Sequence, residues 1–159
     1  MNSIKISSSL KRMGVSLLLA GALCSVAMAT TPTKEVSDQA KKALTTAFPK
    51  AESVKWMESE NGEVCTAYFW LYDVKTVAAY NRNGDLINIL RYYKEDHLPA
   101  GVLAKLKGKY ADKTIAGVTE LTDAEQNISY FVKLEDAKHW YTVKISDDGM
   151  EQTEKLNKQ

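Results

Sequence analysis

Residues 64–71, VCTAYFWL, form the stretch that decides the expected fold. Side chains without a strongly polar group alternate in it with the side chains of Thr, Tyr and Trp, which carry a hydroxyl or an indole N–H. Neighbouring side chains along a β-strand point to opposite sides of a sheet, so the alternation predicts a strand with two different faces. Cys65, Ala67 and Phe69 make up the set expected to face a core. Thr66, Tyr68 and Trp70 make up the set expected to face away from it.

Seven further alternating runs surround this strand. They are Val54–Glu58, Val74–Tyr80 and Leu86–Tyr93 in the first half, and Ile115–Leu121, Ile128–Leu134, Trp140–Ile145 and Met150–Leu156 in the second. Turn sequences such as Asn61-Gly62, Asn83-Gly84 and Asp148-Gly149 separate them. Short alternating runs joined by such turns are typical of antiparallel hairpins.

Each group of four runs follows a segment with helical spacing of its apolar residues. These segments are Lys34–Ala47, which stops at Phe48-Pro49, and Leu98–Tyr110. We therefore expect an α+β fold with two tandem repeats of one helix followed by a four-stranded antiparallel sheet. Repeat one is expected at about residues 34–95 and repeat two at about 96–159.

The first 29 residues have the organisation of a secretory signal peptide. A basic start precedes an apolar stretch, Met13–Met28, and Ala27-Met28-Ala29 has the form of a cleavage site. The other interpretation is a membrane anchor, but the apolar stretch is interrupted by Gly and Ser and is short of the roughly 20 residues that a spanning helix needs. The sequence predicts a domain at residues 30–159, in the periplasm or secreted, with no stable membrane anchor after cleavage.

Charge and composition exclude some classes of partner. The chain has 159 residues, 45% of them hydrophobic, and 21 Lys and Arg against 20 Asp and Glu. Removing Lys5, Lys11 and Arg12 with the signal leaves 18 basic against 20 acidic side chains. A chain without excess positive charge has little to exchange for the counterions of phosphates, so nucleic acid is not an expected partner.

No catalytic or metal-binding motif is present in the sequence. His97 and His139 do not have the spacing of a ligand pair, and no nucleophile elbow, phosphate-binding loop or Cys-x-x-Cys occurs. We therefore expect no enzymatic activity, no cofactor and no metal site. Cys65 is expected to be a small buried residue, with a reactive or dimer-forming thiol as the alternative. Glu58, Glu60 and Glu63 are interpreted as a solvated hairpin tip.

Aromatic and basic residues gather on the strand faces that point away from the expected core. The candidate partner-binding residues are Tyr68, Trp70, Phe131, Lys133, Trp140 and Lys144. Aromatic anchors among polar side chains suit a surface that binds another protein. The alternative is that these aromatics form ordinary cross-strand pairs, since strands are rich in aromatic residues whatever their function.

An ordered set of motifs resembles a known family. Ala47-Phe48-Pro49-Lys50-Ala51 leads to Val54-Lys55-Trp56, Tyr80 to Asp85 form a turn, and Leu98-Pro99 opens a segment that ends at Tyr110. This pattern resembles the secreted PepSY-like proteins of Bacteroidetes, also described as β-lactamase-inhibitor-like. The resemblance implies a duplicated helix-plus-sheet module with a non-enzymatic, inhibitor-like role. It implies no catalytic residues.

These observations predict an exported binding module that holds a protein or peptide of the cell envelope on an exposed sheet face. Inhibition of a hydrolase is the most specific form of this hypothesis. The alternative is a carrier that holds a small apolar ligand between sheet and helices, which requires a sizeable internal cavity.

Overall fold

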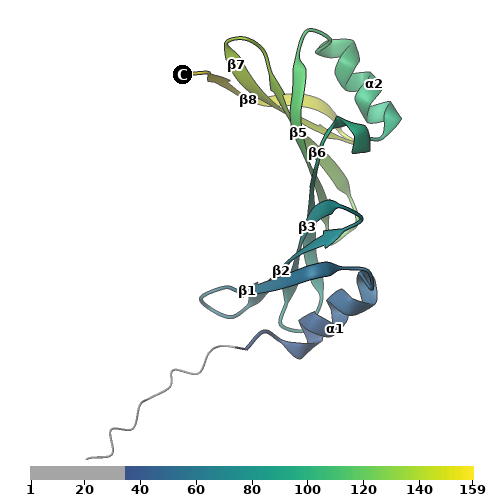
Figure 1. Cartoon of the computed structure of the whole chain (residues 1–159), viewed down its shortest axis with the longest axis vertical. Helices are drawn as coiled ribbons and strands as arrows, with labels where there is room; N and C mark the ends of the chain where they lie inside the picture. Colours follow the sequence, from purple (N-terminus) through teal and green to yellow (C-terminus); the bar gives the residue numbers. More distant parts are fainter. Residues whose placement is uncertain (1–34) are drawn as a thin grey trace, which may run out of the picture. The chain divides into compact units, whose positions relative to one another are not determined.

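The computed structural model describes residues 35–159, which form one eight-stranded antiparallel sheet with two short helices (Figure 1). The predicted signal peptide, residues 1–29, lies outside the described residues. The helices are α1 (Asp38–Ala47) and α2 (Ala100–Lys109), and a 3-10 turn, η1 (Glu95–His97), precedes α2. The strands are β1 (Glu52–Glu58), β2 (Val64–Leu71), β3 (Val74–Asn81), β4 (Leu86–Tyr93), β5 (Thr114–Asp123), β6 (Ile128–Glu135), β7 (His139–Ser146) and β8 (Gly149–Asn157).

The expected fold class is wrong, because the strands do not form two four-stranded sheets. They pair in chain order from β1 to β8, and β4 is joined to β5 from Asn88 opposite Asp123 to Tyr93 opposite Val118. Two separate sheets would leave β4 and β5 as exposed edges with unpaired N–H and C=O groups, and their pairing satisfies these groups. The described chain is mostly β, and one continuous sheet replaces the two tandem repeats.

The positions of the single elements follow the sequence patterns closely. β2 and β4 have the predicted bounds, and the other strands differ by one or two residues at their ends. α1 begins at Asp38 and not at Lys34. It ends at Ala47 because Pro49 disfavours helical backbone at Phe48, whose N–H makes the last bond to the Leu44 carbonyl.

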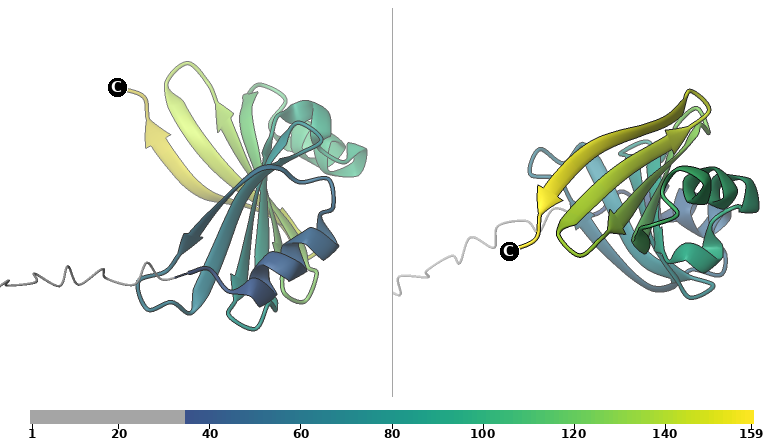
Figure 2. Two further views of the ribbon diagram at one scale, coloured as in Figure 1. Left: turned by 60° about the horizontal axis from the view of Figure 1, so that its bottom comes forward. Right: turned by 90° about the horizontal axis from the view of Figure 1, so that it is seen from above.

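Both helices cover the same face of the sheet (Figures 1 and 2). Leu44 of α1 packs with Cys65, Phe69 and Tyr80, and Leu106 of α2 packs in a second cluster that includes Leu134. Every one of these side chains is 4% exposed or less, and burial of each large apolar side chain contributes roughly 1.5–3 kcal/mol. The set of β2 residues expected to face the core does so.

The opposite face of the sheet carries no helix, and the strands bend around it. The β1–β2 turn, the β6–β7 turn and the end of β8 extend away from the helices, so the sheet is concave on this uncovered side (Figure 1). The two edge strands are each irregular, since β1 has a register shift between Glu52 and Lys55 and β8 pairs with β7 across a shift at Thr142 and Val143. Such bulges discourage a sheet edge from pairing with another chain.

Candidate functional site

The candidate site is the face of the sheet that carries no helix, which we call the open face. Strand register assigns residues to it, because side chains directly opposite each other on paired strands lie on the same face. One row of register partners crosses it from β2 to β8. This row consists of Trp70, Lys75, Tyr92, Thr119, Phe131, Lys144 and Glu151.

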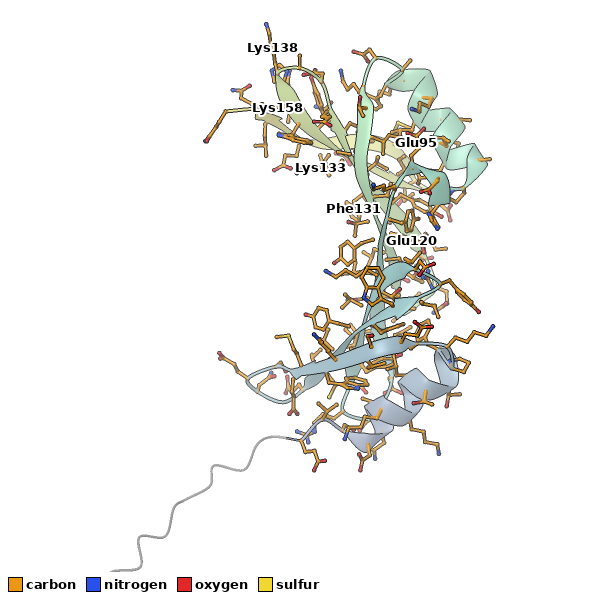
Figure 3. The ribbon with its side chains drawn as sticks, viewed as in Figure 1. Glu95, Glu120, Phe131, Lys133, Lys138 and Lys158 are labelled. Atoms are coloured by element: carbon orange, nitrogen blue, oxygen red, sulfur yellow. The ribbon has the colours of Figure 1, made fainter. Side chains whose placement is uncertain are left out.

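All six candidate residues from the sequence lie on the open face, in two groups. Phe131 and Lys133 of β6 lie beside Lys144 and Trp140 of β7, and Phe131 is the direct partner of Lys144. Figure 3 places Phe131 and Lys133 on the other side of the sheet from Glu120. Tyr68 and Trp70 belong to β2 and are separated from this group by three strands.

The residues that connect the two groups were not predicted from the sequence. Lys75 and Val77 of β3, Leu90 and Tyr92 of β4, and Thr119 of β5 fill the rows between β2 and β6. Tyr92 is 38% exposed and Trp70 is 49% exposed, so both rings offer apolar surface to a partner. Alternation is less clear in β3 than in β2, because Val77 points outward and yet is only 7% exposed, so the sequence pattern did not identify this set.

Trp140 is held in place by two lysines. The ammonium groups of Lys133 and Lys158 each lie 4.5 Å from the centre of its ring, which is a cation–π geometry. Lys158 is itself fixed by a 2.6 Å hydrogen bond to Glu135 and by its backbone N–H, which donates to the Lys138 carbonyl. The indole is therefore ordered before any partner arrives, which lowers the entropic cost of binding.

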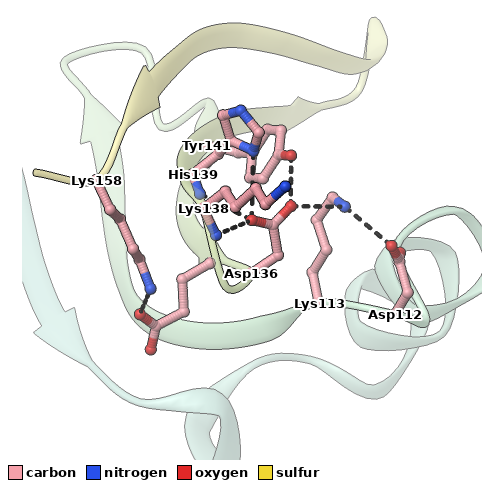
Figure 4. A network of polar contacts seen from close by, with 8 residues as sticks. Asp112, Lys113, Asp136, Lys138, His139, Tyr141 and Lys158 are labelled. Carbon is pink, nitrogen blue, oxygen red and sulfur yellow. Dashed lines mark hydrogen bonds and ion pairs between the residues drawn. The ribbon is translucent and has the colours of Figure 1, made fainter.

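A network around Asp136 fixes the turn that presents Trp140 (Figure 4). The Tyr141 hydroxyl donates to the Asp136 carboxylate at 2.6 Å, and the backbone N–H groups of Lys138 and His139 donate to it at 2.8 Å. The hydrogen bond from Tyr141 is the main cause that holds the pKa of Asp136 well below its usual range. Lys113 adds an ion pair at 3.7 Å and ties β5 to this turn.

Positive charge on the open face is largely unpaired. Among the described residues, no carboxylate forms an ion pair with Lys55, Lys75, Lys94, Lys133 or Lys144. Two acidic side chains of this face are engaged elsewhere, and Glu151, the register partner of Lys144, forms no ion pair with it. Glu135 binds Lys158, and Asp123 accepts hydrogen bonds from the backbone and side chain of Asn127.

A shallow groove of about 380 Å³ lies on the open face across β4, β5 and β6. It is lined by Tyr92, Tyr93, Lys94, Gly117, Val118, Thr119, Phe131 and Lys133. The arrangement can bind an extended segment by burial of apolar groups and by hydrogen bonds to ammonium groups. The residues around the groove include no nucleophile paired with a base, so the geometry supports binding rather than chemistry.

A pocket of about 350 Å³ opens at the edge of the space between α2 and the sheet, where Val102 and Lys105 face Tyr130 and Ile145, but the centre of that space is filled by side chains. Leu106, Val132, Leu134 and Val143 are each 1% exposed or less, as expected for a close-packed core. A carrier of an apolar ligand would need a cavity at this place, so the packing does not favour that alternative. Cys65 is fully buried in the α1 cluster, in the manner of a small hydrophobic residue.

Two further observations concern the described part of the chain. In residues 35–159, no three His, Cys, Asp or Glu side chains gather as a metal site would require. Within the same residues, neither helix has the length and apolar character needed to cross a membrane.

Comparison with solved structures shows the same fold in proteins of Bacteroides species. A BLIP-like protein from Bacteroides fragilis superposes with a TM-score of 0.63 at 17% identity, over 77% of this chain and 86% of that one. A protein from Bacteroides eggerthii described as one of the "putative periplasmic proteins" superposes with a TM-score of 0.61 at 16% identity, over 77% of this chain and 89% of that one. A DUF2874 family protein from Bacteroides uniformis superposes with a TM-score of 0.62 at 17% identity, over 77% of this chain and 90% of that one.

These comparisons support the BLIP-like part of the expected resemblance at the level of the fold. None of the three descriptions names an enzymatic activity, and the expected periplasmic or secreted location agrees with the description of the Bacteroides eggerthii protein. No family model matches the chain, and no curated protein matches it. Membership of the PepSY-like family therefore stays a prediction.

Proposed function

We propose that the chain is a non-enzymatic binding module of the cell envelope, which holds a protein or peptide partner against its open face. One observation carries this proposal. The open face exposes aromatic rings, with Trp70 at 49% and Tyr92 at 38%, while the other side of the same strands is a closed core. Exposed aromatic surface without a covering element marks interaction sites more often than scattered single residues do.

The construction of this face suits recognition of a protein. Its aromatic rings lie on hydrogen-bonded strands and not on loops, so little conformational entropy is lost when a partner binds. Aromatic anchors supply most of the binding energy in typical interfaces, and surrounding charges set specificity and the rate of association. The lysines between the aromatic rings can supply the charges that set specificity and the rate of association.

The more specific form of the proposal is an inhibitor-like role in the periplasm or outside the cell. It is supported by the description of the Bacteroides fragilis protein as BLIP-like and by the shared fold. A hollow sheet face with rigid aromatic side chains can occlude the active-site cleft of a hydrolase without chemistry of its own.

Site-specific photo-cross-linking tests the proposal. A photoreactive amino acid replaces Trp70 or Phe131 on the open face and, as matched controls, the exposed residues Thr45 of α1 and Ala104 of α2. We expect discrete adducts with one envelope protein from the two open-face positions only. Adducts from the helix positions alone would contradict the proposed face. If the captured protein is a hydrolase, titration with the purified chain should reduce its turnover.

A further inference from the structure

The groove across β4, β5 and β6 has the chemistry of a receptor for an acidic side chain. We infer that it receives an Asp or Glu carboxylate of the protein partner, together with an apolar side chain two residues away in the same extended segment. This inference rests on the proposed function and specifies what the partner must present to the open face.

The groove is built from two short rows of side chains on neighbouring strands. Tyr92, Thr119 and Phe131 are register partners and form the first row. Lys94, which follows β4, lies with Gly117 and its partner Lys133 in the second row.

The hollow exists because position 117 has no side chain. A Cβ atom added to Gly117 would meet nothing within 4 Å, so the glycine leaves open space between the two lysines. Its backbone lies outside the left-handed region, so an added Cβ atom meets neither a backbone restriction nor a neighbouring atom. We therefore expect a larger side chain at position 117 to occupy the groove.

The two lysines provide the charge that a carboxylate requires. Lys94 and Lys133 are exposed, and neither has an ion-pair partner among residues 35–159. The Lys133 side chain lines the groove, and its ammonium lies 4.5 Å from the centre of the Trp140 ring. A carboxylate placed over Gly117 would form charge-assisted hydrogen bonds, which are stronger than neutral ones.

The first row provides the apolar part of the site, at a defined distance. Tyr92 and Lys94 are two residues apart, as are Phe131 and Lys133, which corresponds to about 6.6 Å along an extended strand. An extended peptide has the same repeat, so its residues i and i+2 point to the same side. A segment that lies along the strands can therefore place an apolar side chain on the two rings and a carboxylate between the two lysines.

An anionic membrane surface is the other ligand that could attract these lysines. The sheet is concave on the side of the open face, and the β1–β2 and β6–β7 turns project on that side (Figure 1), so a flat bilayer would contact these turns before the groove. A narrow peptide segment or loop can enter between them. The geometry favours an acidic protein segment.

NMR titration of the isotope-labelled chain with two blocked peptides tests the inference. The probe is Gly-Phe-Gly-Glu-Gly, and its control is Gly-Phe-Gly-Gln-Gly. We expect the Glu peptide to shift the amide signals of Gly117, Thr119 and Lys133, and the Gln peptide to bind about fivefold more weakly, the effect of losing two exposed ion pairs. Equal affinities, or shifts outside the groove, would overturn the inference.

Variants make the test specific to the groove. Gly117→Leu and Lys94→Glu should each weaken binding of the Glu peptide at least as much as the Gln control does, whereas Lys42→Glu on α1 should leave it unchanged. Thermal melting verifies that Gly117→Leu folds. Vesicles of phosphatidylglycerol that shift the same signals more strongly than the peptide would overturn the inference in favour of a lipid. Adducts at Trp70 and Phe131 without peptide binding would refute only the acidic assignment and leave the proposed function standing.

Discussion

The two faces of the sheet share every strand and differ in what covers them. Val132 and Val143 point to the helices and are fully buried, whereas their neighbours Lys133 and Thr142 point to the open face and contact solvent. The same backbone therefore supports a core on one side and an uncovered surface on the other. Both clusters of buried side chains lie on the helix-covered face, so we expect most of the stability to come from that side and the open face to be available for recognition.

The comparison is tested most strongly by removing one large side chain from each face of β6. Leu134→Ala should lower the free energy of unfolding by about 3 kcal/mol, because it leaves a cavity under α2. Lys133→Ala should lower it by less than about 1 kcal/mol, the value of an exposed cation–π contact. Urea denaturation of both variants measures the difference. Similar losses would show that the two faces contribute alike.

Glycines provide a second contrast between the two sides. Gly84, in the β3–β4 turn, has φ of +87°, and a Cβ there would lie 2.8 Å from the backbone oxygen of Gln39 in α1. Gly84→Ala should therefore cost about 2 kcal/mol, through backbone strain and a clash that pushes α1 away. Gly117→Ala on the open face meets nothing and should change the urea midpoint little. The comparison fails if both substitutions are equally tolerated.

An ion pair on each face gives the third contrast. On the helix-covered side, Glu120 pairs with Arg91 and accepts a 2.7 Å hydrogen bond from the Tyr93 hydroxyl, and its side chain is 12% exposed. Glu120→Gln should cost about 1.5 kcal/mol, because it leaves Arg91 partly buried without a counter-charge. Glu135→Gln, which releases Lys158 on the open face, should cost at most about 0.5 kcal/mol.

A tyrosine titration provides an independent measurement for the Glu120 variant. Burial, and then the hydrogen bond to Glu120, raise the pKa of Tyr93 well above its ordinary value. Glu120→Gln removes the charge that opposes ionisation, so the pKa of Tyr93 should fall. An unchanged ultraviolet titration of Tyr93 would mean that this contact is absent in solution.

The sequence was sufficient to predict the elements and their faces. Alternation within VCTAYFWL assigns Phe69 to the core and Trp70 to the other side, and the structure agrees because side-chain direction in a strand depends on local backbone geometry alone. The partner of a strand depends on contacts distant in sequence. The alternating pattern of Leu86–Tyr93 is compatible with β4 as an edge strand and with β4 paired to β5. The single sheet could therefore not be predicted from it.

The same limit explains what was missed at the candidate site. Placing Lys75 and Tyr92 in one row with Trp70 and Phe131 requires the register of four strand pairs, which turn sequences do not determine. Glu58 was interpreted as part of a solvated tip, and this is wrong. Its side chain is 8% exposed and lies 3.5 Å from Arg82, which reaches it from the turn after β3. No local pattern shows that contact.

The smallest expected effect concerns the turn that joins the two faces, where Tyr141 points to the core and Trp140 to the open face. The hydroxyl of Tyr141, and then the backbone N–H of Lys138, keep the pKa of Asp136 below its usual range. Because this pKa is lower in the folded than in the unfolded chain, the stabilisation is present above about pH 4 and is lost as the pH falls through the folded value.

Asp136→Asn should therefore be less stable than the parent chain near neutral pH, and the gap between their urea midpoints should close as the pH is lowered below about 4. Asp112→Asn is the matched control, since its side chain is 74% exposed and its one ion-pair partner is Lys113. It should show little difference at any pH. If the difference between the urea midpoints of Asp136→Asn and the parent chain stayed constant down to acid pH, the negative charge of Asp136 would not be the cause of the stabilisation. In that case the turn would hold Trp140 on the open face equally well with a neutral side chain.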